Sequence, residues 1–137
     1  MTQNEKQIVY KDLCGRLPYG FFVNRHTRFG NEDVFFEGNE YSLGELGYLL
    51  EALDKYSEIK VYLRSMHTIT DKELNSLCEY CGCNMLTTDK DNLVLLDNAP
   101  LKNNILAIDW LNQHHLDYRG LIAKGLAMEA KTNMYRS

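Results

Sequence analysis

The C-terminal part of the chain contains the stretch that decides the fold, Asp109-Trp110-Leu111-Asn112-Gln113-His114-His115-Leu116-Asp117-Tyr118-Arg119-Gly120-Leu121-Ile122-Ala123-Lys124-Gly125. Apolar residues recur at helical spacing over residues 101–116, directly after Pro100, and this predicts a helix. Asp117 is placed to cap a short final helix that ends at Gly125. The stretch therefore predicts a C-terminal helix-turn-helix corner.

The first of these two helices is predicted to bury one face. At 100° per residue, that face contains Leu101, Ile105, Ile108, Leu111 and His115. His115 is therefore expected to point toward the core. His114 is expected nearer the side of the helix on which Ala107 and Trp110 lie.

The rest of the chain supplies strands and three further helix starts. Capping boxes at residues 2–5, 42–45 and 70–73 predict helices that end before Pro18, near residue 53 and near Tyr80. Residues 21–23 and 34–36 read as a hairpin with a turn at Gly30-Asn31. Ile59, Val61 and Leu63 alternate with Lys60, Tyr62 and Arg64, which is typical of a half-buried strand. A second hairpin is expected over residues 85–96.

This order of elements predicts an α+β fold with a small, mostly antiparallel sheet covered on one face by about five helices. The 137 residues contain no linker or repeat, so one domain is expected over residues 1–137. The segment 130–137 is polar and is expected to fray.

Composition excludes several classes of protein. A net charge of -4 and a pI near 5.5 argue against a non-specific nucleic-acid binder. No apolar run approaches the roughly 20 residues that cross a bilayer, and the first residues lack the pattern of a signal peptide. The sequence thus favours a cytoplasmic protein, without a membrane contact, whose four cysteines stay reduced.

The central stretch offers one candidate catalytic group. His114, His115 and Asp117, backed by Tyr118 and Arg119, could form a general acid/base or metal-binding set. The alternative is a structural corner in which His115 packs, Asp117 caps and Arg119 pairs with a carboxylate. Adjacent histidines on a helix diverge by about 100°, so they rarely bind one ion together, and this favours the structural interpretation.

A second candidate is a metal site. Cys78, Cys81 and Cys83 lie within six residues, and His67 upstream could be a fourth ligand. Zinc sites usually have two separated pairs of ligands, whereas this chain has one cluster and only Cys14 elsewhere. A buried Cys78 at the end of a helix, beside two incidental thiols, is the favoured interpretation.

A third candidate is the first hairpin, where Arg25, His26 and Arg28 alternate with aromatic residues in a pattern that could bind single-stranded nucleic acid. The aromatic residues are Phe21, Phe22 and Phe29. Glu32, Asp33 and Glu37 cancel most of the positive charge, so the favoured interpretation is a solvated hairpin tip over a phenylalanine core. No dinucleotide-binding, phosphate-loop, zinc-protease or nucleophile-elbow motif is present, so no cofactor is expected.

Three stretches resemble a group of small uncharacterised proteins from phages, prophages and mobile elements of anaerobic gut bacteria. They are Lys11-Asp12-Leu13-Cys14-Gly15-Arg16-Leu17-Pro18-Tyr19-Gly20, then Ile59-Lys60-Val61-Tyr62-Leu63-Arg64-Ser65-Met66 running into Thr70, and residues 109–130 with Met134-Tyr135. The resemblance covers about half of the chain and implies an accessory role in a bacterial or phage cytoplasm. The chain departs from the pattern at Ser65, where proline is common, and at Leu116, where an aromatic residue is common. The cysteine cluster does not belong to the pattern.

The shared stretches define a set of candidate ligand-binding residues beside the histidines and Asp117: Arg16, Tyr19, Arg64, Trp110, Tyr118 and Arg119. These residues could equally be the framework of the fold. We expect a non-enzymatic module that binds a host or phage protein or a small ligand. Two alternatives stay open: a hydrolase or nucleotide-processing enzyme that uses His114, His115, Asp117 and Arg119, and a single-strand nucleic-acid binder. The sequence is also compatible with a homo-oligomer.

Overall fold

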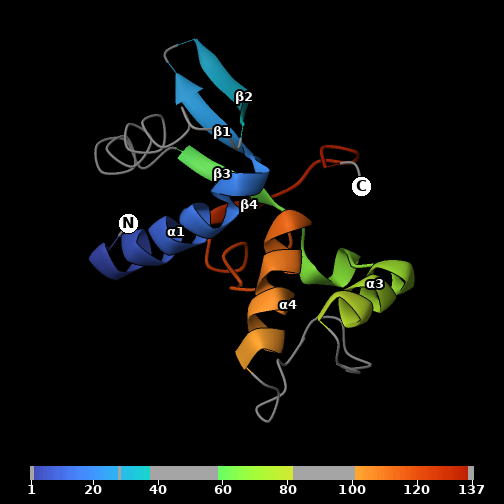
Figure 1. Ribbon diagram of the computed structural model, residues 1–137. Helices are drawn as coiled ribbons and strands as arrows, with labels where there is room; N and C mark the ends of the chain where they lie inside the picture. The colour runs from blue at the N-terminus through green and yellow to red at the C-terminus, as the bar shows by residue number, and fades with distance from the viewer. Residues whose placement is uncertain (1, 28, 38–58, 82–100, 136–137) are drawn as a thin grey trace.

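The computed structural model describes residues 2–27, 29–37, 59–81 and 101–135. The elements, in chain order, are α1 (Gln3–Arg16), the 3-10 helix η1 (Leu17–Tyr19), β1 (Phe21–Thr27), β2 (Gly30–Phe36), β3 (Ile59–Leu63), the 3-10 helix η2 (Met66–Thr68), α3 (Asp71–Cys81), α4 (Leu101–Gln113) and β4 (Ala127–Glu129) (Figure 1). This arrangement confirms the α+β class. The helix predicted over residues 42–53 and the hairpin predicted over residues 85–96 lie outside the described residues.

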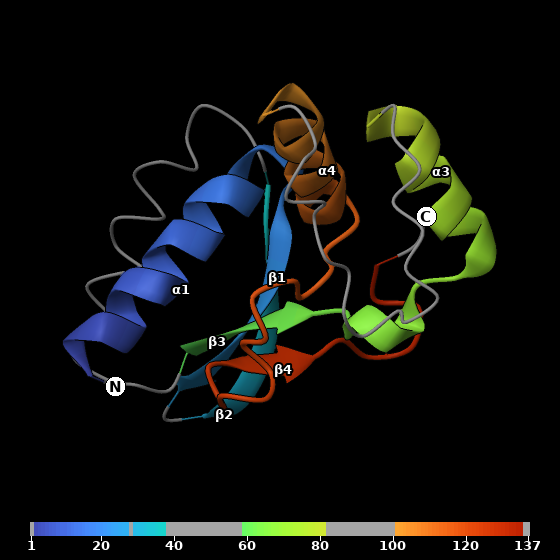
Figure 2. The ribbon, with the colours of Figure 1, turned by 90° about the horizontal axis from the view of Figure 1, so that it is seen from below.

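The sheet has four strands in the order β2-β1-β3-β4. β1 pairs antiparallel with both β2 and β3, whereas β3 pairs parallel with β4, so the sheet is mixed, and two of its three strand pairings are antiparallel. Figure 2 shows α4 between α1 and α3, with the sheet to one side of these helices. In the described ranges, no helix has the length and apolar character that crossing a bilayer requires.

Local sequence signals determine where two helices begin. The Thr2 hydroxyl accepts from the Glu5 N–H, and the Glu5 carboxylate accepts from the Thr2 N–H, which is the predicted capping box of α1. Thr70 and Glu73 make the same reciprocal pair at the start of α3. These hydrogen bonds confirm both predictions. Both could be made from the sequence because each capping box depends only on residues three positions apart.

The first hairpin is longer than predicted. Thr27 pairs with Gly30, so the predicted turn pair Gly30-Asn31 lies inside β2. Gly20, with a φ of +76°, leads the chain from η1 into β1, and a Cβ there would lie 2.7 Å from the Phe36 carbonyl oxygen. Glycine is therefore required at this bend.

The chain builds two hydrophobic cores. The first lies between α1 and one face of the sheet and contains Val9, Leu13, Leu17, Phe21, Val23, Val61, Leu63, Leu121, Leu126 and Ala127. The second lies between α3, α4 and η2 and contains Met66, Ile69, Leu77, Ala107, Trp110, Leu111 and Leu116. The predicted apolar stripe of α4 is confirmed at Leu111, which is buried, but is wrong at Ile105, which is 53% exposed, and Ala107 and Trp110 are buried instead. The buried face of α4 is the one that meets α3.

The prediction of about five helices and a C-terminal helix-turn-helix is not supported: the described residues hold three α-helices and two 3-10 turns. α4 ends at Gln113 because His115 adopts a φ of +62°. The His115 N–H donates to the Asn112 carbonyl and the Leu116 N–H to the Leu111 carbonyl, which is a Schellman motif with histidine in the place usually held by glycine. Gly120 and Gly125 also have positive φ, so turns replace the predicted final helix.

The second face of the sheet is partly covered by the C-terminal segment 130–135. The Ala130 N–H donates to the Leu63 carbonyl, and the Lys131 ammonium lies 2.5 Å from Asp33 and over the Tyr62 ring. Tyr62, expected on the solvent side of β3, is therefore only 2% exposed. The segment expected to fray is thus fixed to the sheet as far as Tyr135.

Candidate functional site

The motif residues Asp12 and Arg16 form a buried ion pair on α1. They are four residues apart, so both side chains project from the same side of the helix. The Arg16 guanidinium donates through Nε to Asp12 Oδ2 at 2.8 Å and through Nη2 to Asp12 Oδ1 at 3.1 Å, and both side chains are fully buried. Nη2 also donates to the Leu116 carbonyl at 2.7 Å. Arg16 therefore ties α1 to the turn after α4, and its buried position keeps it from a ligand in solvent.

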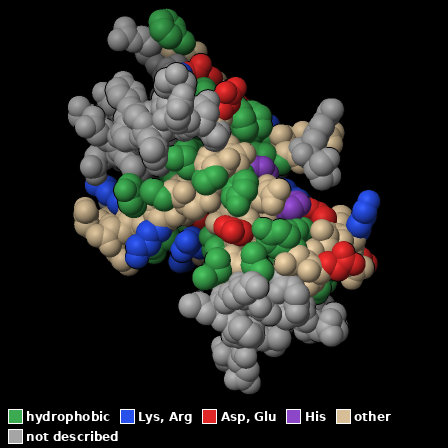
Figure 3. All heavy atoms as spheres, in the orientation of Figure 1, with side chains coloured by type: hydrophobic (Ala, Val, Ile, Leu, Met, Phe, Trp, Pro, Cys, Tyr) green, Lys and Arg blue, Asp and Glu red, His purple; other side chains and the backbone are tan. Residues whose placement is uncertain are grey.

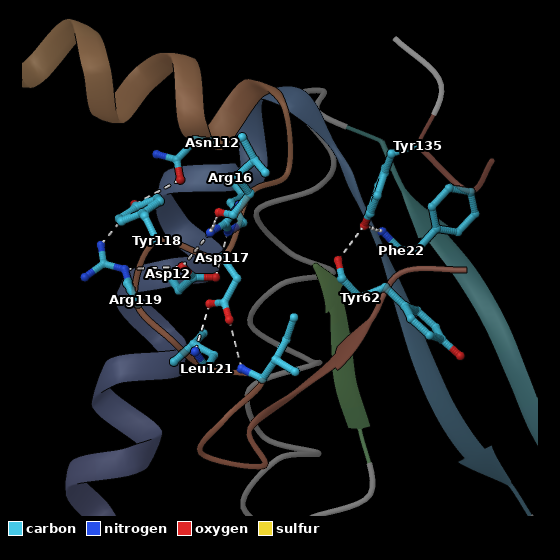
Figure 4. A network of polar contacts seen from close by, with 12 residues as sticks. Asp12, Arg16, Phe22, Tyr62, Asn112, Asp117, Tyr118, Arg119, Leu121 and Tyr135 are labelled. Carbon is cyan, nitrogen blue, oxygen red and sulfur yellow. Dashed lines mark hydrogen bonds and ion pairs between the residues drawn. The ribbon is translucent and has the colours of Figure 1, made fainter. Parts of the chain in front are cut away.

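Tyr118 lies between two guanidinium groups in this network (Figure 4). Arg16 and Arg119 lie 5.3 Å and 5.1 Å from the centre of its ring. The Tyr118 hydroxyl donates to Asn112 Oδ1 at 3.0 Å, and Arg119 Nε lies 3.2 Å from Asp12 Oδ1. Asp12 is thus shared by both arginines, and this carboxylate is the partner that the structural interpretation expected for Arg119.

Asp117 organises the turn that follows α4. Its two carboxylate oxygens accept from the N–H groups of Leu121 at 2.8 Å and Ile122 at 3.0 Å. Its own N–H donates to the Arg64 carbonyl at 2.8 Å, which joins the turn to the end of β3. Because Asp117 is buried and both oxygens are bonded to backbone, it acts as a cap rather than as a free base.

Arg64 is held by a carboxylate of this chain. Its Nη1 and Nη2 each donate to one oxygen of Glu73 at 2.8 Å, and they lie near the carbonyls of His114 and Thr68. Hydrogen bonding from Arg64 lowers the pKa of Glu73 to about 2, even though partial burial raises it. The charge of Arg64, one of the predicted ligand-binding residues, is therefore already neutralised within the chain.

The two histidines lie against different partners, and both follow the end of α4 rather than lying on it. The His114 ring stacks on Trp110 at 3.8 Å, with Nδ1 2.9 Å from the Trp110 carbonyl oxygen. The His115 ring stacks on Tyr135 at 3.7 Å. Burial lowers the pKa of His115 to about 4, helped by the charge of Arg16, so its ring is neutral at neutral pH. No atom among the described residues is a hydrogen-bond partner of the buried Nδ1 of His115.

Tyr135 is the residue that sequence reasoning missed. Its hydroxyl accepts from the Phe22 N–H at 2.7 Å and donates to the Tyr62 carbonyl at 2.8 Å (Figure 4). It thus joins β1 to β3 just beyond Val23 and Val61, the last pair in their ladder. The ring also meets Phe22 edge-on at 5.5 Å. Two signals were available: an aromatic residue within a largely polar C-terminal segment, and the Met134-Tyr135 pair among the stretches that carry the resemblance.

The remaining ligand candidates do not join this network. Tyr19 is half-buried in η1, where burial and the nearby charge of Asp109 raise its pKa. Cys78 is half-buried, while the side chains of Cys81 and Cys83 lie outside the described residues. His67 is exposed and its Nδ1 lies 2.6 Å from the Ser65 hydroxyl. Within the described ranges, no three His, Cys, Asp or Glu side chains are placed to bind a metal ion together.

The first hairpin has its charges paired across the strands. Arg25 lies opposite Glu32 and donates to it through Nε at 2.8 Å. Phe21 is fully buried, and Phe22 packs on Phe35 with ring centres 4.8 Å apart. Phe29, at the tip, is 92% exposed. The side chains of His26 and Arg28 lie outside the described residues. Among the described side chains of this hairpin, Arg25 is paired with Glu32, whereas Phe29 and Phe35 are exposed.

Comparison with known proteins finds no family model, no curated protein and no solved structure that matches this chain. Any inference about function therefore rests on the contacts within this chain. They assign most of the polar motif residues to the framework: Asp12, Arg16, Arg64, Asp117, Tyr118 and Arg119 bond to one another, to backbone or to Glu73.

Proposed function

We propose that this chain is a non-enzymatic module that binds another protein through its exposed surface. One observation carries the proposal: the polar residues nominated for chemistry are engaged inside the chain, whereas large apolar side chains remain exposed on the β1–β2 hairpin. Phe29 is 92% and Phe35 is 45% exposed. Hydrophobic side-chain atoms are visible at the tip of this hairpin in Figure 3.

Aromatic side chains are the usual anchors of protein interfaces because they bury a large area at a small cost in conformational entropy. The Phe35 ring is already oriented by Phe22, at a 4.8 Å centre-to-centre distance. A pre-oriented ring loses less freedom on binding than a mobile one. The resemblance to phage and mobile-element proteins supports a partner from the bacterial host or from the element itself.

The test is photo-cross-linking in a bacterial host. A benzoyl-phenylalanine replaces Phe29, and a matched control carries it at Tyr10, which is 50% exposed on α1. We expect one defined cross-linked protein from position 29, absent from position 10 and lost when Phe35→Ser is added. Equal products from both positions, or none from position 29, would contradict the proposal.

Native mass spectrometry of the purified protein separates this function from small-ligand binding. We expect the mass of the polypeptide alone, or of a whole multiple of it. A small molecule that is retained in the native spectrum and lost on denaturation would instead show a ligand-binding module.

A further inference from the structure

The C-terminal segment that follows β4 is held on the sheet at two separate points. At the first point, the Lys131 ammonium lies 2.5 Å from a carboxylate oxygen of Asp33. At the second point, the Tyr135 hydroxyl accepts from the Phe22 N–H and donates to the Tyr62 carbonyl, as Figure 4 shows. Loss of the second contact alone would free only the end of the segment.

A turn separates the two points. The Met134 N–H donates to the Lys131 carbonyl at 3.0 Å, and Asn133 has a left-handed backbone with a φ of +64°. A few residues between two anchored positions can absorb a change in φ and ψ and so act as a hinge. Tyr135 can therefore leave the sheet about this turn while Lys131 stays in place.

The Tyr135 ring lies against His115. The ring centres are 3.7 Å apart and the planes differ by 12°. The buried Nδ1 of His115 has no hydrogen-bond partner among the described residues. A neutral imidazole has one donor and one acceptor, but an imidazolium carries an N–H at both nitrogens. A charged ring at this position would therefore bury a donor without an acceptor, which is costly.

Two guanidinium groups are bonded to the chain on either side of His115. Arg16 Nη2 donates to the Leu116 carbonyl at 2.7 Å, and Arg64 Nη1 donates to the His114 carbonyl at 3.3 Å. A positive charge on His115 would face both of these cations. Burial of the ring, with the charges of Arg16, His114 and Arg64, lowers the pKa of His115 to about 4.

The carboxylates around this position are engaged by other donors. Asp12 binds Arg16, Glu73 binds Arg64, and both oxygens of Asp117 accept from backbone N–H groups. These carboxylates therefore compensate the arginines and the turn rather than a charged His115. Protonation of this ring is compatible with the fold only if the ring moves out of the stack.

The contact at Lys131 responds to acid in a different way. Hydrogen bonds from Lys131, Asn24 and Tyr62 lower the pKa of Asp33 below its ordinary value of 3.8. Burial raises the pKa of the Tyr135 hydroxyl, which stays protonated in acid. Between pH 6.5 and pH 4, His115 is therefore the group of these three whose protonation opposes the closed arrangement.

We infer that residues 130–135 form an acid-sensitive strap: protonation of His115 expels its ring from the stack with Tyr135, and the end of the strap leaves the sheet while Lys131 stays on Asp33. The His115 ring is half-buried, so rotation of its side chain brings it into solvent.

Opening of the strap changes the middle of the sheet. The Phe22 N–H and the Tyr62 carbonyl, which lie on the inner strands β1 and β3, lose their shared partner. The Phe22 ring loses the edge-on contact with Tyr135 and keeps its contact with Phe35. The inference concerns this chain alone, so it stands or falls independently of the proposed binding of another protein.

The first test is amide hydrogen exchange of the natural chain, followed by NMR and expressed as protection relative to the intrinsic rate at each pH. Below pH 6.5 we expect protection of the Phe22 amide to fall roughly five- to tenfold per pH unit, as linkage to one proton requires. The Ala130 amide, which donates to the Leu63 carbonyl, and the amides of α1 should keep their protection. Constant protection at Phe22, or an equal fall at all of these amides, would overturn the inference.

The second test identifies the titrating group. Asn tolerates the left-handed conformation of position 115, so His115→Asn should give a Phe22 protection that no longer depends on pH, whatever its absolute level. His67→Asn is the matched control, because His67 is exposed on η2 and should leave the pH dependence unchanged. A fall in His115→Asn as steep as in the natural chain, or its loss in His67→Asn, would overturn the inference. If His115→Asn does not fold, the difference between Phe22 and Ala130 in the natural chain still decides.

Discussion

The buried network around Arg16 and the exposed hairpin around Arg25 contain the same kind of ion pair in opposite surroundings. Arg16 and Asp12 are fully buried, whereas Arg25 and Glu32 are each 46% exposed. A buried charge is costly unless every partner is present, while an exposed pair contributes little because water competes for both groups. Arg16 is therefore part of the framework of the fold, whereas the exposed hairpin is the surface to which we assign the proposed partner.

Among the substitutions considered, Arg16→Leu is expected to reduce the stability of the fold most. It leaves the Asp12 carboxylate buried beside Arg119 alone and frees the Leu116 carbonyl, so we expect the free energy of unfolding to fall by about 3–5 kcal/mol. Urea unfolding followed by circular dichroism measures this loss. Asp12→Asn with Arg16→Gln is the matched control, since a neutral pair should recover part of the stability. A loss near that of an exposed arginine would refute the framework role.

Asp117→Ala tests whether the turn after α4 depends on its cap. The substitution leaves the N–H groups of Leu121 and Ile122 without their acceptor, so we expect a loss of about 2 kcal/mol. Asp117→Asn retains one acceptor oxygen and should lose less. If both variants unfold at the same urea concentration as the natural chain, the carboxylate is free for another role.

The pH dependence of stability should reveal His115. The folded chain keeps this ring neutral down to a pKa of about 4, whereas the unfolded chain binds a proton near the ordinary value of 6.5. The free energy of unfolding should therefore fall as the pH drops from 6.5 to 4, by at most about 1.4 kcal/mol per pH unit. Asn tolerates the positive φ of this position, so His115→Asn should remove most of the slope in urea titrations between pH 6.5 and about 5. The contribution of Glu73, whose pKa is lowered to about 2, remains at lower pH. An unchanged slope would assign it to other groups.

Tyr135→Phe keeps the stacked ring and deletes only the hydroxyl between β1 and β3. The Phe22 N–H and the Tyr62 carbonyl lose their shared partner, so we expect a loss of about 1 kcal/mol. Hydrogen exchange should accelerate at the Phe22 amide more than at amides of α3, which lies in the other core. Equal acceleration of exchange at the Phe22 amide and at the amides of α3 would mean that the hydroxyl stabilises the whole fold rather than the junction of β1 and β3.

The smallest effect is expected on the hairpin itself. Arg25→Ala removes an exposed ion pair and should change the free energy of unfolding by less than about 1 kcal/mol. A loss as large as that of Arg16→Leu would erase the distinction between the two regions. The same urea titration provides the comparison.

Sequence reasoning succeeded where the cause is local. Thr2 with Glu5, and Thr70 with Glu73, start helices through contacts three residues apart. It failed at the C-terminal corner because the periodicity of α4 gave no sign that His115 would replace glycine in the left-handed conformation. The parallel strand β4 was missed because three residues, Ala127 to Glu129, are too few for an alternating pattern.

The site candidates were partly predictable for the same reason. The i,i+4 spacing of Asp12 and Arg16 could be read from the sequence, but their burial depends on Leu116, 100 residues later. The pairing of both Nη groups of Arg64 with Glu73 could not be predicted from the sequence, because it requires the turn of η2 between them. Chemistry-bearing residues can thus be identified from sequence, whereas their availability is decided by tertiary contacts.

The contact between Tyr135 and Phe22 joins positions 113 residues apart. During synthesis, β1 and β3 leave the ribosome long before the residue that joins them beyond their ladder. The sheet cannot be completed until residue 135 has emerged, so the last stage of folding follows translation of almost the whole described chain. Loss of Tyr135 would likewise remove a link between β1 and β3, the two inner strands of the sheet, rather than shorten a loose end.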